Sequence, residues 1–75
     1  MTKLLIIVPK GSALDFYLVD SGFIFDEIVR ISHSSYYKIN VTDKMDLINF
    51  FISKFSLQDY TIRCDHGEFI FRVRS

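Results

Sequence analysis

The run Leu4–Val8 restricts the fold of this chain more than any other stretch. It contains five consecutive apolar residues and is followed by Pro9. Side chains alternate between the two faces of a β-strand, so both faces of a strand built from this run would be apolar. A strand that needs cover on both faces is typical of the centre of a sheet. A buried helical segment is the alternative, but the run is short and Pro9-Lys10-Gly11 would end a helix. We therefore predict a central strand.

The bulk composition indicates one small globular domain that spans residues 1–75. The chain is 49% hydrophobic, which is too apolar for a disordered segment. Nine basic and nine acidic residues cancel, which argues against purely electrostatic binding to nucleic acid. A single cysteine excludes an internal disulfide and fits a reducing cytosol. The N-terminal apolar run is too short for a signal peptide or a membrane span, so we expect a cytoplasmic protein that does not bind membranes.

Residues 13–20 are predicted to form a short helix. Ser12 is a favourable N-cap, Asp15 lies three residues further on, and Gly22 suits the C-terminal end. However, the run Phe-Tyr-Leu-Val over residues 16–19 would also suit a strand. In that case the sheet would be mostly antiparallel with a single helix packed on it, still in the α+β class.

A second helix is predicted to follow Thr42 or Asp43, either of which can serve as its N-cap. Apolar residues then recur at the helical spacing i, i+3, i+4 and i+7, at Ile48, Phe51, Ile52 and Phe55. Phe50 lies outside this stripe, roughly 140° from its centre. We interpret Phe50 as a residue that packs at the flank of the helix, with an exposed partner contact as the alternative.

Two hairpins complete the predicted elements. In the first, the alternating runs 23–32 and 36–41 flank the polar break His33-Ser34-Ser35. The register that satisfies both of these patterns pairs Val29 with Ile39 and Ile31 with Tyr37. In the second hairpin, His66-Gly67 forms a two-residue turn. Its register pairs Cys64 with Phe69, Ile62 with Phe71 and Tyr60 with Val73.

The order of these elements is strand, helix, strand, strand, helix, strand, with one extra strand at the end. The first six elements resemble the ferredoxin-like split βαβ arrangement, which places the first strand in the middle of the sheet. The resemblance concerns element order only and implies no function, because this fold hosts many unrelated ones. We therefore predict a small α+β domain with a mainly antiparallel sheet and two helices on one face.

The sheet face opposite the helices is expected to bind a partner. It would have an apolar centre, a basic periphery and few of the acidic residues. Protein interfaces often combine an apolar centre with a polar rim, and Arg and Tyr are enriched in them. The expected partner is a larger protein or a second copy of the chain. Together with Phe50 as an exposed contact, the candidate partner-binding residues are Tyr36, Lys38, Arg30, Phe50, Arg63, Ile70, Arg72 and Arg74.

No sequence pattern predicts catalysis, a metal or a cofactor. In the predicted second hairpin Cys64 points into the core, whereas His66 lies in the turn, so the two diverge. A zinc site needs about four convergent ligands, and the chain has one cysteine and two histidines. Lys10-Gly11-Ser12 lacks the further glycines of a phosphate-binding loop. We therefore expect a protein that is not an enzyme and carries no cofactor.

The expected function is inhibition or regulation of a larger protein. Small chains rich in Ile, Phe, Lys and Ser are common among regulators and inhibitors of phages and other mobile elements, so an anti-defence protein fits. The alternative is a nucleic-acid-binding module in which Tyr36 stacks on a base and the basic residues contact phosphates. The chain lacks the Gly-aromatic signature of RNA-recognition modules. In a third interpretation the basic residues are only solvated and the chain termini cover the apolar ones.

Overall fold

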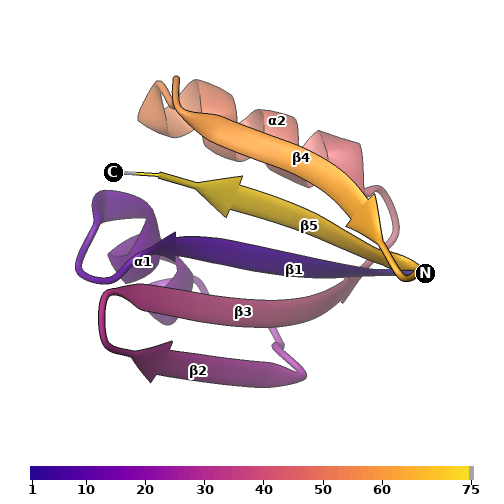
Figure 1. Cartoon of the computed structure of the whole chain (residues 1–75), viewed down its shortest axis with the longest axis horizontal. Coiled ribbons are helices and arrows are strands. Elements are labelled where there is room, and N and C mark those ends of the chain that lie inside the picture. Colours follow the sequence, from indigo (N-terminus) through magenta and orange to yellow (C-terminus); the bar gives the residue numbers. More distant parts are fainter. Residues whose placement is uncertain (75) are drawn as a thin grey trace.

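The computed structural model describes residues 1–74. Their secondary structure confirms the predicted α+β class and element order (Figure 1). The helix over residues 13–20 is also confirmed, and the side chain of Ser12 accepts a hydrogen bond from the N–H of Asp15. The elements are β1 (Thr2–Pro9), α1 (Ala13–Asp20), β2 (Glu27–Ile31), β3 (Ser34–Val41), α2 (Lys44–Phe55), β4 (Tyr60–Asp65) and β5 (Glu68–Val73).

The strands form one sheet in the order β2-β3-β1-β5-β4, which confirms that the run Leu4–Val8 lies in the central strand. β1 is antiparallel to β3 and parallel to β5, and the other neighbouring strands are antiparallel. The strand that extends the ferredoxin-like order is β5, and it lies between β1 and β4. It is apolar on both faces over Phe69-Ile70-Phe71, which suits an interior position, whereas β4 carries Thr61 and Arg63 on one face and suits an edge.

Both helices cover the same face of the sheet (Figure 1). α2 begins after Asp43, whose side chain accepts the N–H of Asp46. Tyr17 of α1 packs against Phe51 and Phe55 of α2, with ring centroids 6.3 and 5.5 Å apart. The core between helices and sheet consists of Leu4, Ile6, Val8, Leu14, Leu18, Tyr37, Ile39, Ile48, Phe51 and Phe71.

The β4–β5 hairpin has the predicted register. The turn residues His66 and Gly67 both have left-handed backbone angles, with φ at 52° and 78°. Tight two-residue hairpins require positive φ, and glycine adopts it without strain. Turn chemistry and side-chain alternation therefore agree on the observed pairs Tyr60–Val73, Ile62–Phe71 and Cys64–Phe69.

The predicted register of the first hairpin is wrong. β2 and β3 are joined by a two-residue turn at Ser32-His33, and the serines that follow belong to β3. Val29 pairs with Tyr36 and not with Ile39, which lies three residues further along. A shift by an odd number of residues exchanges the two faces of a strand.

A bulge at the start of β2 explains this exchange. Phe25 faces the core as predicted, and its ring centroid lies 5.0 Å from that of Tyr37. The N–H of Asp26 donates to the carbonyl of Lys38 at 2.8 Å, and Glu27 is paired with the same lysine. Two residues opposite one break the alternation of side chains. Beyond this bulge, every side chain of β2 therefore lies on the face opposite to the predicted one.

Candidate functional site

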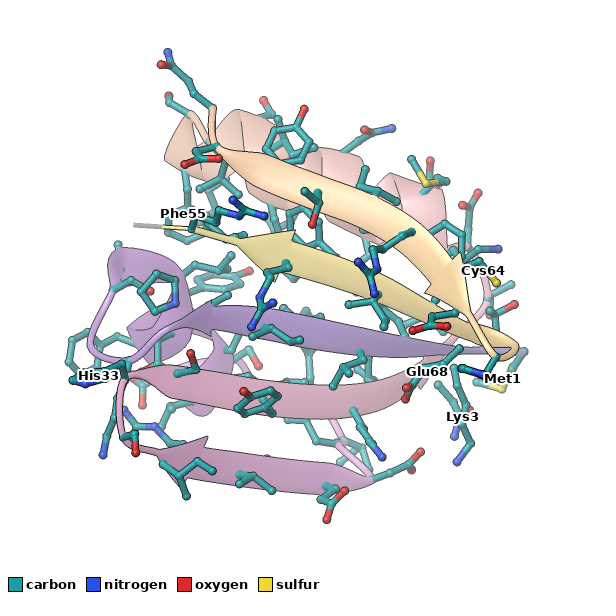
Figure 2. All side chains as sticks on the ribbon, viewed as in Figure 1. Met1, Lys3, His33, Phe55, Cys64 and Glu68 are labelled. Carbon is teal, nitrogen blue, oxygen red and sulfur yellow. The ribbon has the colours of Figure 1, made fainter. Side chains whose placement is uncertain are left out.

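The sheet face away from the helices, here called the open face, is not covered by any helix of residues 1–74 (Figure 2). Strand pairing places Leu5 and Ile7 of β1 in its middle, beside β3 on one side and β5 on the other. Six of the eight predicted partner-binding residues lie on this face, and their role in binding stays a prediction. These six are Tyr36, Lys38, Arg63, Ile70, Arg72 and, just beyond the end of β5 and beside Arg72, Arg74.

A shallow apolar groove of about 270 Å³ runs across the open face toward β2. Tyr36 lies in its middle, between Ile7 of β1 and Val29 of β2. The bulge in β2 creates this groove, because it turns Val29 and Ile31 outward. Sequence reasoning placed both residues in the core and so missed the groove. The lining residues are Leu5, Glu27, Val29, Ile31, Tyr36 and Lys38.

Carboxylates neutralise part of the basic periphery of the open face. Lys38 Nζ lies 3.6 Å from Glu27 Oε1 and 4.0 Å from Glu68 Oε2. Arg63 Nη2 lies 3.4 Å from Asp65 Oδ2. Exposed pairs of this kind contribute little to stability, but they remove net charge from the surface. The open face is therefore less basic than predicted, although most acidic residues do lie elsewhere.

The free positive charge gathers at one end of the open face. Arg72 and Arg74 line a shallow basin of about 340 Å³ with His33 and Ser34. Within residues 1–74, neither arginine forms an ion pair. Figure 2 shows His33 at this end of the sheet and Glu68 at the opposite end. The uncompensated cations are thus separated from the carboxylates of the face.

The prediction that Arg30 belongs to the basic periphery is wrong. Because of the bulge, Arg30 lies on the helix side of the sheet. Its Nη2 donates to Asp15 Oδ2 at 2.8 Å, and its Nε donates to Ser35 Oγ at 3.4 Å. The Asp15 side chain is fully buried on α1, whereas 35% of the Arg30 side chain is exposed. Arg30 therefore anchors the edge strand to the first helix and is not available on the open face.

Asp15 is the centre of a buried hydrogen-bond network. Its carboxylate also accepts the N–H of Gly11 at 2.8 Å and the hydroxyl of Tyr37 at 2.5 Å. Burial raises the pKa of Asp15, but hydrogen bonds from Gly11, Tyr37 and Arg30 outweigh burial and hold that pKa below its ordinary value. Burial, together with the bond to Asp15, raises the pKa of Tyr37 above its ordinary value. At neutral pH the carboxylate is therefore ionised and the phenol protonated, as suits a structural network.

The sequence pattern predicted for Asp15 only a capping role at the start of a helix, three residues after Ser12. The one available signal was its position directly after Leu14, on the flank of the apolar side of α1. The two side chains that donate to it, those of Arg30 and Tyr37, come from strands and are 15 and 22 residues further along the chain. The local pattern therefore could not identify them.

Phe50 lies on α2, on the helix side of the sheet and away from the open face. It is 45% exposed. Its ring centroid lies 6.2 Å from Tyr17 and 5.8 Å from Phe51. Phe50 therefore packs at the flank of the aromatic cluster between the helices, and its exposed half is separate from the residues of the open face.

The prediction that Cys64 is buried is wrong, because Cys64 is exposed at the edge strand β4. Its side chain shares the helix side of the sheet with that of Phe69. His66 lies in the turn, as predicted, and its Nδ1 is 2.9 Å from Asp65 Oδ1. Within residues 1–74, no three His, Cys, Asp or Glu side chains gather in an arrangement suited to a metal ion.

Neither helix found in residues 1–74 has the length and apolar character needed to span a membrane. Comparisons with models of protein families, with curated proteins and with solved structures find no match to this chain. Its function must therefore be inferred from the geometry and charges of the open face.

Proposed function

We propose that this chain is a non-catalytic protein-binding domain that docks on a larger protein through the open face. The observation that carries this proposal is the apolar groove around Tyr36, on a face that no helix covers. Large apolar surfaces on small proteins frequently mark interaction sites. Leu5, Val29 and Ile31 supply the apolar area, and Tyr36 supplies an aromatic ring with a polar end, which suits the centre of an interface.

The charges around the groove favour a protein partner over nucleic acid. Lys38 and Arg63 already have carboxylate partners on the same face. A rim with both signs of charge offers paired contacts to a protein surface, whereas it would repel part of a phosphate backbone. Nucleic-acid binding remains the alternative, supported by Arg72 and Arg74 beside the groove, which form no ion pair with the side chains of residues 1–74.

Such a domain would act by occupying a surface of its partner, and this mode of action needs no catalytic group. We propose that it inhibits or regulates the partner, with a phage or another mobile element as the biological setting that its composition favours. The exposed free thiol of Cys64 fits a reducing compartment, so we place this activity in the cytoplasm.

The test compares two variants that each remove one aromatic ring. Tyr36→Ser alters the open face, and Phe16→Ser is the matched control, because Phe16 is 56% exposed on α1 in the helix layer. Each tagged variant is used to capture proteins from a lysate of its native cell, with and without nuclease. Mass spectrometry identifies the retained proteins, and thermal unfolding confirms that both variants are folded.

We expect one stoichiometric protein to bind the unmodified chain and the Phe16→Ser variant, with or without nuclease, and to be lost from Tyr36→Ser. Retention by a folded Tyr36→Ser variant would contradict the proposal. Loss of all partners after nuclease would favour the alternative. In that case the double substitution of Arg72→Glu and Arg74→Glu should abolish nucleic-acid binding, because each arginine that contacts a phosphate releases counterions.

A further inference from the structure

The free edge of β2 exposes apolar side chains on both of its faces. Eight large apolar residues are exposed in residues 1–74, and four of them lie at this edge. Ile28 is 49% exposed on the helix side and Ile31 58% on the open face, while Ile24 in the preceding loop is 86% exposed. Val19 lies one helical turn after Asp15, on the side of α1 that faces β2, and is 47% exposed.

The backbone of this edge is also free to pair. The carbonyl of Lys38 accepts from Asp26, and Glu27 is the strand partner of Lys38, so the hydrogen-bonding groups of Glu27 face β3. These groups alternate along an antiparallel strand. The N–H and C=O groups of Ile28 and Arg30 therefore point away from the sheet. Proteins usually guard such an edge with lysine, proline or a covering segment, and β2 contains neither residue.

The charges of β2 do not oppose a second copy, because both are compensated within the chain. Glu27 lies 3.6 Å from Lys38, and Arg30 lies 2.8 Å from Asp15. The remaining three residues of the strand are Ile28, Val29 and Ile31. Two such edges can approach each other without like-charge repulsion between the strands.

We propose that the β2 edge is a self-association site, at which two copies pair antiparallel about a two-fold axis through Val29. Ile28 of each copy then lies opposite Arg30 of the other, and both residues of this pair have outward-facing backbone groups. Glu27 lies opposite Ile31. Every residue of β2 gains a partner, and no like charges face each other. The pairing joins two five-stranded sheets into one continuous sheet.

Neighbouring two-fold registers are less favourable. An axis through Arg30 would set the two Arg30 side chains against each other. An axis through Ile28 would pair Ile31 with Phe25, which lies outside β2 beyond the bulge. Only the axis through Val29 keeps the whole strand in the ladder. It also brings the two apolar grooves together, because Val29 lines the groove of each copy.

A disulfide crosslink tests the register. The two Val29 residues would form a non-hydrogen-bonded pair with Cα atoms about 4.5 Å apart, within the range of a disulfide. Val29→Cys, in a Cys64→Ser background, should therefore form a covalent dimer under mild oxidation. The matched control is Ile31→Cys, on the same strand and face, whose two copies would lie about 13 Å apart. Crosslinking of Ile31→Cys as fast as Val29→Cys would overturn the register.

The mass in solution tests the association itself. Light scattering after size exclusion, from micromolar to near-millimolar concentration, should approach twice the chain mass of 8.8 kDa. Ile28→Lys places a cation opposite Arg30 of the second copy and should yield a monomer. Cys64→Lys introduces the same charge on the helix side of the opposite edge strand and should leave the dimer intact. An unmodified chain that stays monomeric, or a folded Ile28→Lys variant that stays dimeric, would overturn the proposal.

This inference concerns the edge of the sheet, whereas the proposed function concerns its open face, so the two can fail separately. Ile28 lies on the helix side, and its substitution leaves the groove unaltered in each copy. Tyr36→Ser changes the open face without altering the β2 edge. A monomer that still captures its partner would refute self-association alone, and a dimer that captures no protein would refute only the docking proposal.

Discussion

Replacing Asp15 by alanine tests how much of the stability of this domain depends on one buried carboxylate. The side chain accepts hydrogen bonds from the N–H of Gly11, the hydroxyl of Tyr37 and the guanidinium of Arg30. After the substitution, Arg30 can turn to water, because part of its side chain is already exposed. The N–H of Gly11 lies in an exposed turn and can also be hydrated. The hydroxyl of Tyr37 loses its carboxylate acceptor inside the core and keeps only the longer hydrogen bond to the main-chain carbonyl of Asp15, at 3.3 Å.

Loss of the charge-assisted bond from this buried hydroxyl costs about 2 kcal/mol, and loss of the bond from Gly11 adds about 1 kcal/mol after hydration. We therefore expect Asp15→Ala to lower the free energy of unfolding by about 3 kcal/mol. In a domain of this size each kcal/mol shifts Tm by about 4–8 °C, so Tm should fall by about 12–24 °C. Tyr37→Phe removes the donor of the same bond, so the double variant should lose less free energy of unfolding than the sum of the two single losses.

The same residue should make stability depend on pH. The folded pKa of Asp15 lies below its ordinary value, so the unfolded chain binds this proton more readily than the folded one. The stabilisation is present above the unfolded pKa, about 3.9, and is lost as pH falls through the lower folded pKa. The difference between the unmodified chain and Asp15→Ala should therefore shrink from neutral pH to about pH 3.

Chemical denaturation followed by circular dichroism at both pH values measures these differences. The control is Asp20→Ala, which removes an exposed carboxylate from the same helix and should change stability by less than about 0.5 kcal/mol. An Asp15→Ala variant as stable as the Asp20→Ala control, or a loss that is the same at both pH values, would refute this account of the network.

Four further substitutions test the packing, a helix cap and a turn by thermal unfolding. Phe50→Ser should cost about 1 kcal/mol, because half of the ring is exposed, whereas Phe51→Ala in the core should cost about 3–5 kcal/mol; equal losses would place Phe50 in the core. Ser12→Ala removes the N-cap of α1 and should cost about 1 kcal/mol; no change would mean that the cap is dispensable. Gly67→Ala meets no atom within 4 Å but has φ at 78°, so its cost of about 1 kcal/mol should be conformational.

The two hairpins show where local sequence information suffices and where it does not. In β4–β5, a turn with glycine in a left-handed conformation and a clean alternation of apolar and polar residues agree on one register. In β2–β3, the turn residue with positive φ is Ser32, and the turn carries no glycine to mark its position. The strand itself has apolar residues on both faces, so alternation alone permits either orientation.

The local pattern also could not predict how exposed a residue is at its position in the assembled sheet. Cys64 alternates with apolar partners and points to the helix side, as predicted, yet it is exposed because β4 is an edge strand. The exposed half of Phe50 likewise depends on how α1 and α2 pack together. Burial is a property of the assembled layers, and alternation indicates only the direction of a side chain.

The sequence by itself determined the elements whose signals are local: the central strand with two apolar faces, the capped helices, the second hairpin and the α+β class. The tertiary structure alone decided the bulge at Asp26, the outward orientation of Val29 and the insertion of β5 beside β1. The physical reason for the bulge and for the orientation of Val29 lies in Arg30, which is drawn to the helix side by a buried carboxylate 15 residues earlier. A buried carboxylate without a partner would cost more free energy than a shifted strand register. The local sequence pattern contains no information about this difference, because the two charges lie in different elements.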